Sequence, residues 1–402
     1  MFIGENLTNL RIMHGYSRKQ LSDMLHITEQ AVWQYENNYT SPKLQIVNQL
    51  KSIFHVKSKY FYHQDVLKRY FSTGNIPVMN IAYRSKLRNV ISKTEAEAKH
   101  MEYLDSFINY ITTHLSIPTQ KIIQLRDEVI HYLNSTLDER TQQISNVAKL
   151  ARKRLGLRND TNDDVMFLIE KNGAFIFEKS IGEEIDAYSL WTEKQRPFIV
   201  LGNRKHSAVR RNFDLAHELG HLLLHYKVEF THLDGKEHKN MEDEANLFAG
   251  AFLLPKEDFL EDLNTISFVT NPDAYLDLKK KWKVSLQVLG YRAAHLGIMD
   301  AKKHRNFYAS LHRKGYLKRE PLDDLLPIQK PQKIKSIIDL IAKKGIIDIH
   351  KMLERDWMVE IDFLHRLTGI DKGFFTNYLV MDQDFELVHV NNITSVVQKK
   401  NG

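Results

Sequence analysis

The sequence of 402 residues contains no cysteine. This absence excludes disulfides, thiolate zinc sites and cysteine nucleophiles, and it is compatible with a reducing cytoplasm. No stretch approaches the roughly 18 consecutive apolar residues that a transmembrane helix needs. The start, Met1 to Asn6, lacks the basic segment and apolar core of a secretory signal. We therefore expect a cytoplasmic protein without a membrane partner.

The sequence also lacks internal repeats and a glycine-rich loop that could hold a phosphate group. What is present is ordinary for a globular protein, with 43% hydrophobic and 27% charged residues. A net charge of +7 modestly favours an anionic partner. A chain of this length is expected to hold about two to four domains.

The most informative motif is His-Glu-Leu-Gly-His at residues 217–221. Apolar residues at helical spacing surround it without an interrupting proline, so the motif is predicted to lie on a helix. His217 and His221 are four residues apart and share one face of that helix, where both rings can bind one metal ion. Glu218 lies close to the same ion and can carry a proton from a water molecule to a leaving amine.

A catalytic zinc site needs a third protein ligand and one open position. The acidic residues 242–244 open a second apolar-periodic stretch that ends at Pro255, so they are predicted to lie on a second helix. Glu244 is our choice as third ligand and Glu242 the alternative, because side chains two positions apart point about 200° apart on a helix. The acidic cluster could instead be an ordinary helix start. His225 is expected to support the site rather than to bind the ion.

Together the two motifs resemble those of the ImmA/IrrE family of zinc metallopeptidases. The resemblance rests on Arg-x-Phe-x-x-Ala-His-Glu-x-Gly-His-x-x-x-His at residues 211–225 and Glu-Ala-Asn-x-Phe-Ala-x-x-x-Leu-x-Pro at residues 244–255, and it covers about residues 155–300. It implies a thermolysin-like centre with one Zn²⁺ per chain and a repressor protein as the substrate. The implied ligands are His217, His221 and Glu244, with Glu218 as the general base. Manganese or iron could occupy a similar nitrogen–oxygen site.

The first 60 residues carry short helical patterns separated by tight turns. Ser17 is followed three residues later by Gln20, which is the pattern of a capping box. Thr28 caps a further helix that runs to Glu36, after a turn at residues 26–27. Two short helices joined in this way predict a helix-turn-helix.

This segment resembles the XRE (lambda-repressor-like) family of DNA-binding domains across about residues 5–60. The resemblance implies that the helix at residues 28–36 enters the major groove of a double-stranded operator. Arg18 and Trp33 depart from the family, which often has glutamine and a small residue there, and the indole could touch DNA or pack inward. The alternative is a four-helix interaction module that has lost DNA binding. The candidate DNA contacts are Arg18 and Lys19 for phosphates, and Thr28, Glu29, Gln30, Trp33 and Gln34 for base edges or the nearby backbone.

Three strands are predicted before the zinc motif, at residues 173–178, 186–191 and 197–201. In zincins the edge of a strand beside the cleft pairs with an extended peptide, and one of the latter two strands is expected to do so. Tyr188, His206 and His225 are candidate donors to the oxyanion of the reaction, although a packing role is favoured for each.

The predicted fold is mainly α with a small α+β zincin-like domain. Four parts are expected: an all-α helix-turn-helix head at 1–70, a helical linker at 71–154, the metallopeptidase domain at 155–300 and a mostly helical C-terminal region at 301–402. The linker could be a spacer or the surface of a homodimer. Basic residues between 302 and 319, with Phe307 and Tyr316 among them, could form a second nucleic-acid surface, although a solvated face is favoured.

These expectations combine into a transcriptional regulator whose zinc peptidase domain cleaves a helix-turn-helix repressor. The alternative is a repressor or antitoxin-type DNA-binding protein whose zinc domain is a sensor or scaffold with little proteolysis. Both alternatives keep the metal ligands and the general base, so the motif does not decide between them.

Overall fold

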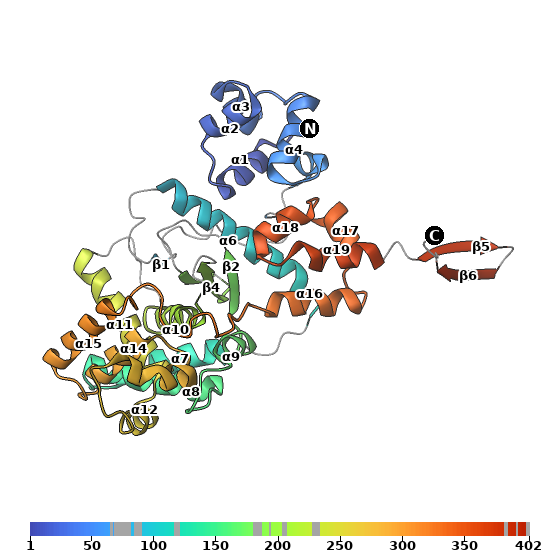
Figure 1. Cartoon of the computed structure of the whole chain (residues 1–402). Helices are drawn as coiled ribbons and strands as arrows, with labels where there is room; N and C mark the ends of the chain where they lie inside the picture. The colour runs from blue at the N-terminus through green and yellow to red at the C-terminus, as the bar shows by residue number, and fades with distance from the viewer. Residues whose placement is uncertain are drawn as a thin grey trace. The chain divides into compact units, whose positions relative to one another are not determined.

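In a computed structural model, the described part of the chain consists mainly of helices, with a four-stranded sheet and a separate two-stranded sheet (Figure 1). The predicted class, mainly α with a small α+β domain, is confirmed. The structure describes residues 1–64, 67, 82–83, 91–115, 121–179, 187–192, 194–202, 207–226, 234–381, 385–390 and 393–398. Within these ranges, no helix combines the length and the hydropathy that crossing a bilayer requires.

Two compact units make up the chain. The first contains Met1–Val78, Asn89–Ser116 and Ile334–Gly402, and the second contains Met79–Arg88 and Ile117–Lys333. Each unit therefore combines segments that are distant in the sequence.

Four short helices form the N-terminal head of the first unit. They are α1 (Gly4–Met13), α2 (Arg18–Leu25), α3 (Glu29–Glu36) and α4 (Leu44–Phe54). Ser17 and Gln20 form the predicted capping box of α2, and Thr28 caps α3. Between these two helices His26 takes a left-handed conformation with φ of 54°, which closes the turn.

Two arginines meet Glu36 inside this head. Arg11 donates from Nε to one carboxylate oxygen of Glu36 at 2.5 Å, and Arg18 donates from Nε to the other at 2.6 Å. The Glu36 side chain is only 1% exposed, so the two guanidinium groups compensate the burial of its carboxylate. The two ion pairs hold the end of α3 against α1 and the start of α2, which fixes the helix that is expected to read DNA.

The C-terminal helices belong to the same unit as the head. The long helix α6 (Ile91–Thr112) packs against α1 and α18, and the hydroxyl groups of Tyr60 and Tyr103 lie 2.8 Å apart. Phe107 of α6 meets Trp357 edge to face. The other described elements of this part are η1 (Ser58–Tyr62), α16 (Lys333–Lys343), α17 (Ile349–Lys351), the π-helical η6 (Met352–Asp356), α18 (Ile361–Thr368), α19 (Lys372–Met381), β5 (Phe385–Val390) and β6 (Ile393–Gln398).

The second unit is built around the sheet, whose strand order is β1-β3-β4-β2. β1 (Ala82–Tyr83) and β4 (Pro197–Gly202) are both antiparallel to β3 (Ala187–Trp191), and β2 (Phe175–Lys179) is parallel to β4. The three predicted strands are confirmed to within two residues. The helices of this unit are α7 (Lys121–Ser135), α8 (Arg140–Leu155), α9 (Val165–Lys171), α10 (Ala208–Leu224), α11 (Gly235–Leu253), α12 (Lys256–Leu263), η5 (Pro272–Tyr275), α13 (Leu276–Trp282), α14 (Leu286–His295) and α15 (Ala301–Arg313).

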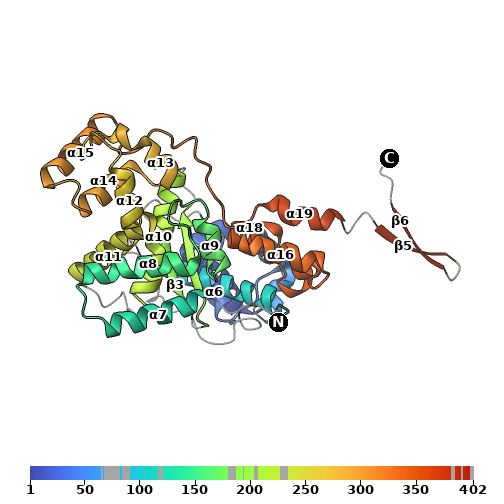
Figure 2. The same ribbon diagram turned by 90° about the horizontal axis from the view of Figure 1, so that it is seen from below.

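The division into two units cuts across the predicted linker and the predicted C-terminal region. α6 belongs to the first unit, whereas α7 and α8 lie side by side in the second (Figure 2). α15 also belongs to the second unit, where Phe307 is fully buried in the space that Gly290 leaves open. Phe307 is therefore not available to stack on a nucleic-acid base. Periodicity reveals that a helix has an apolar face, but it does not reveal which distant helix will cover that face.

A buried ion cluster fastens α13 to the segment that follows α15. Lys279 is fully buried, and its Nζ lies 2.7 Å from carboxylate oxygens of both Glu320 and Asp323. We expect Lys279→Met to destabilise the chain by about 3–5 kcal/mol, because two buried carboxylates lose their counter-charge. Urea denaturation followed by tryptophan fluorescence measures the loss. Lys280→Met, at an exposed lysine paired with Asp277, should cost less than about 1 kcal/mol. Equal losses for the two variants would contradict this role of Lys279.

Candidate metal centre

The predicted metal-binding motif lies on α10, which packs against β3, β4 and α11. His217 and His221 are one turn apart, and their Nε2 atoms are separated by 3.0 Å. Gly220 allows α11 to come close, since a Cβ at this position would lie 2.9 Å from Cδ1 of Phe248 on α11. The glycine of the motif is thus required by the packing of the two helices that carry the site.

Glu242 on α11 completes the group. One of its carboxylate oxygens lies 3.4 Å from Nε2 of His217, and the other lies 3.4 Å from Nε2 of His221. One donor atom from each of the three residues lies within 4.8 Å of the others. A tetrahedral zinc ion with bonds of about 2.1 Å would separate its ligand atoms by about 3.4 Å. The three donors therefore fit a divalent cation in both chemistry and spacing.

The group lies at the boundary between the core and solvent. His217 is fully buried, whereas the Glu242 side chain keeps 18% of its surface exposed. Burial raises the pKa of the Glu242 carboxyl group, but hydrogen bonds and charges from the two histidines outweigh burial and hold this pKa below its ordinary value. The carboxylate is therefore ionised at neutral pH, which is the form that binds a cation.

Glu244, the predicted third ligand, is not part of this group. Its carboxylate accepts hydrogen bonds from Arg140 on α8, at 2.8 Å from Nε and 2.6 Å from Nη2, and lies 3.1 Å from Nε2 of His225. The reason is helical phase, because Glu242 and Asn246 are four residues apart and share the face of α11 that meets the two motif histidines. The structure therefore brings the alternative, Glu242, to the motif histidines, and it does not bring Glu244 there.

Two polar residues contact the motif histidines on their Nδ1 side. The side-chain oxygen of Asn246 lies 3.0 Å from Nδ1 of His217, and Nδ1 of His225 lies 2.9 Å from Nδ1 of His221. Burial lowers the pKa of His225 to about 4, against the opposing effect of Glu244, so this ring is neutral at pH 7. Both Nε2 atoms of the motif are left directed at Glu242.

Glu218, the candidate base, contacts the sheet. The hydroxyl of Ser189 on β3 donates to a carboxylate oxygen of Glu218 at 2.8 Å and to its backbone carbonyl at 3.1 Å. Glu218 is 2% exposed. The carboxylate is thereby held against β3, on the helix that carries both motif histidines, and it is not one of the three donors of the metal-binding group.

In the described part of the sheet, both strands that were expected to offer an edge to a peptide have strand neighbours on each side. β4 is paired on both sides, with β3 and β2, so it has no edge to offer. The outer edge of β3 pairs with β1 at Tyr188 and Ser189. Tyr188 points to the opposite face of the sheet from Ser189, because side chains alternate along a strand, so it is not an oxyanion donor beside Glu218. His206 lies outside the described residues.

The candidate DNA contacts on α3 are mostly exposed. Glu29 and Gln30 face solvent in the first turn, and Gln34 is half-buried. The hydroxyl of Thr28 accepts the backbone N–H of Ala31 at 3.1 Å, so Thr28 also serves as the helix cap.

Trp33 and the basic residues of α2 have partners within the head. Trp33 is 37% exposed and stacks on Tyr39 with ring centroids 5.1 Å apart, so the indole is not packed inward. Lys19 pairs with Asp23 at 2.5 Å on the surface. Arg18, a candidate phosphate contact, donates a hydrogen bond from Nε to Glu36.

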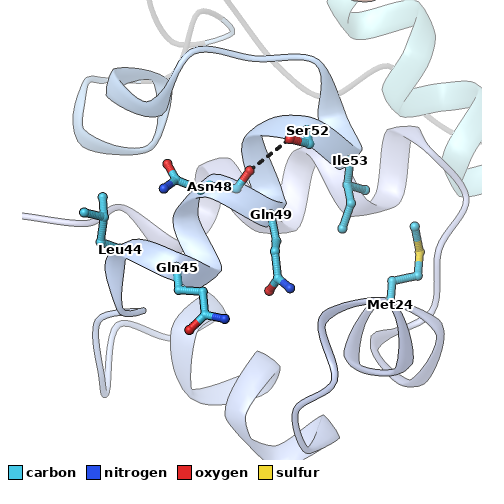
Figure 3. A pocket seen from close by; sticks show the side chains of 7 residues that line it. All are labelled: Met24, Leu44, Gln45, Asn48, Gln49, Ser52 and Ile53. Atoms are coloured by element: carbon cyan, nitrogen blue, oxygen red, sulfur yellow. Dashed lines mark hydrogen bonds between the residues drawn. The ribbon is translucent and has the colours of Figure 1, made fainter.

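A pocket of about 700 Å³ lies in the head and not at the metal-binding group. Figure 3 shows it between Met24 of α2 and side chains of α4 that include Leu44, Gln49 and Ile53. None of its lining residues is titratable, so the pocket offers no catalytic acid or base and no imidazole or carboxylate ligand for a metal.

Three residues around the centre were missed by the sequence analysis. Asn246 belongs to the Glu-Ala-Asn stretch and lies four residues after Glu242, and this spacing was the signal that could have identified it. Ser189 lies on a predicted strand and Arg140 on a predicted helix, but nothing in the sequence links either one to the motif.

Two parts of the chain match models of known protein families. Residues 169–294 match the model described as the IrrE N-terminal-like domain, and residues 7–61 match the model described as helix-turn-helix. The first match contains α10 and α11, and the second contains α2, α3 and α4. Both resemblances seen in the sequence are confirmed. Among curated proteins, none matches the chain.

Proposed function

We propose that this chain, which joins an XRE-type helix-turn-helix domain to an IrrE-like metallopeptidase domain, is a transcriptional regulator that cleaves a second helix-turn-helix repressor. The observation that carries the proposal is the convergence of His217, His221 and Glu242, with Glu218 next to His217 on the same helix. Two imidazoles and one carboxylate are the donor set of zinc hydrolases that keep a position open for water. The fusion supports the choice of substrate, because binding to the same DNA raises the local concentration of the repressor.

Zinc held by these three side chains would lower the pKa of water at its open position to about 7 and would polarise the peptide carbonyl. Glu218 accepts the proton of the attacking water and passes it to the leaving amine. The hydroxyl of Ser189 donates to the carboxylate of Glu218 at 2.8 Å and thereby restricts its orientation. Asn246 fixes the ring of His217 through Nδ1.

Metal analysis of the purified chain, combined with co-expression of any helix-turn-helix repressor that is encoded beside its gene, tests this proposal. We expect one equivalent of zinc and one cut in an exposed inter-domain segment of the repressor, mapped by mass spectrometry. A chain without metal would contradict the site. A zinc-loaded chain that leaves the repressor intact would contradict the substrate.

The exposed first turn of α3 makes Gln30 the residue to test for DNA recognition. A glutamine can form two hydrogen bonds with the major-groove edge of adenine. We expect Gln30→Ala to weaken binding to an operator selected from random duplexes by about 1–3 kcal/mol, with little effect on unrelated DNA. Fluorescence anisotropy at fixed salt measures both affinities. Gln142→Ala, at an exposed glutamine of α8, is the control. A uniform loss on both DNAs would indicate a backbone contact instead.

A further inference from the structure

A continuous line of polar contacts leads from the motif to the surface of α8. Nδ1 of His221 lies 2.9 Å from Nδ1 of His225, and Nε2 of His225 lies 3.1 Å from a carboxylate oxygen of Glu244. The guanidinium of Arg140 donates to both oxygens of that carboxylate, at 2.8 and 2.6 Å. His225 is 6% exposed, whereas the Arg140 side chain is 43% exposed, so the line begins in the core and ends in solvent.

The direction of every hydrogen bond in this line follows from one condition. If His221 binds a cation through Nε2, the single proton of its neutral ring must be on Nδ1. Nδ1 of His221 then donates to Nδ1 of His225, which must be bare. The proton of His225 is therefore on Nε2, where it meets the acceptor Glu244. Arg140 holds that carboxylate in place, in its ionised form, through a bidentate ion pair.

We propose that Arg140, Glu244 and His225 form a positioning relay that fixes the ring orientation and the tautomer of His221. The proposal rests on the metal site of the proposed function, and it gives Glu244 a role without making it a ligand. Carboxylates that accept a hydrogen bond from a metal-bound histidine commonly orient its ring. Here the imidazole of His225 lies between the carboxylate of Glu244 and the ring of His221. Arg140 lies outside residues 169–294, so the helix before the matched domain contributes to the metal centre.

Zinc affinity of the full chain, measured by competition with a chelator, tests the relay. We expect Arg140→Gln to lower the zinc affinity by about 10-fold to 100-fold. Arg140→Lys should lower it less, because lysine keeps the positive charge although it cannot form the bidentate pair. Arg154→Gln is the matched control, because Arg154 lies on the same helix and pairs with Glu128 on the surface. This control should bind zinc as the wild type does.

Two further measurements separate positioning from simple support of the fold. The Tm of the metal-free Arg140→Gln chain should stay within about 2 °C of the wild type, because Arg140 is the exposed end of the pair, with 43% of its side chain in solvent. In the zinc-loaded wild type with ¹⁵N-labelled histidine, we expect the proton on Nε2 of His225 and on Nδ1 of His221. A proton on Nδ1 of His225 would overturn the relay.

The outcomes distinguish this inference from the proposed function. If the wild type binds no zinc, both are overturned. If the wild type binds one equivalent and Arg140→Gln binds it equally tightly, only the relay is overturned. A weaker zinc affinity that is matched by a large drop in the Tm of the metal-free chain would likewise overturn the relay, since Arg140 would then act through the fold.

Discussion

Glu218→Gln is expected to slow repressor cleavage by about 10²-fold to 10⁴-fold while the zinc content stays at the wild-type level. Glutamine cannot accept the proton of the attacking water. Its amide oxygen can nevertheless accept the hydroxyl of Ser189, which lies 2.8 Å from the Glu218 carboxylate, so the local structure should be kept. The rate is measured from the disappearance of intact repressor, and the zinc content by metal analysis of the same preparation.

The matched control is Glu257→Gln, which changes a carboxylate of the same unit whose side chain is 69% exposed. It should leave both cleavage and zinc content unchanged. Cleavage at the wild-type rate by Glu218→Gln would remove the general base from the mechanism. In cells, an unchanged phenotype for Glu218→Gln, together with a lost phenotype when α3 is disrupted, would favour the DNA-binding protein whose zinc domain is a sensor or scaffold.

Local chemistry explains which parts of the fold could be predicted. The capping box of Ser17 and Gln20 and the capping threonine at 28 identified the starts of α2 and α3, because a cap requires only residues close in sequence. The four-residue spacing of His217 and His221 placed both rings on one face of α10 for the same reason. Three strands of the sheet were found from their apolar residues and flanking turns.

Contacts between distant segments explain the rest. The partner of a helix face depends on tertiary packing, so the assignment of α6 and α15 to different units had no signal in the sequence. β1 consists of two residues, which is too short a stretch to show strand periodicity. Arg140 contacts Glu244 across 104 residues of sequence, and no local pattern connects them.

The choice between Glu242 and Glu244 required both helical spacing, which the sequence shows, and tertiary packing, which it does not show. Helical geometry established that only one of the two acids could face the motif, and it could not say which, because the rotation of α11 about its axis was unknown. That rotation is set by packing, which includes the close approach of Phe248 to Gly220. The packing of α11 against α10 thus selects the acid that meets His217 and His221.

Glu242→Ala is expected to lower zinc affinity by more than about 100-fold, because it removes a donor that lies 3.4 Å from both motif histidines. Glu244→Ala should lower the affinity by about 10-fold to 100-fold, the range for a residue that orients a ligand without touching the ion. The two variants are matched in residue type and lie two positions apart on α11. Chelator competition measures both affinities in the full chain. The reverse order, with Glu244→Ala the more damaging, would show that zinc rotates α11 away from the arrangement seen here and recruits the acid that the sequence first suggested.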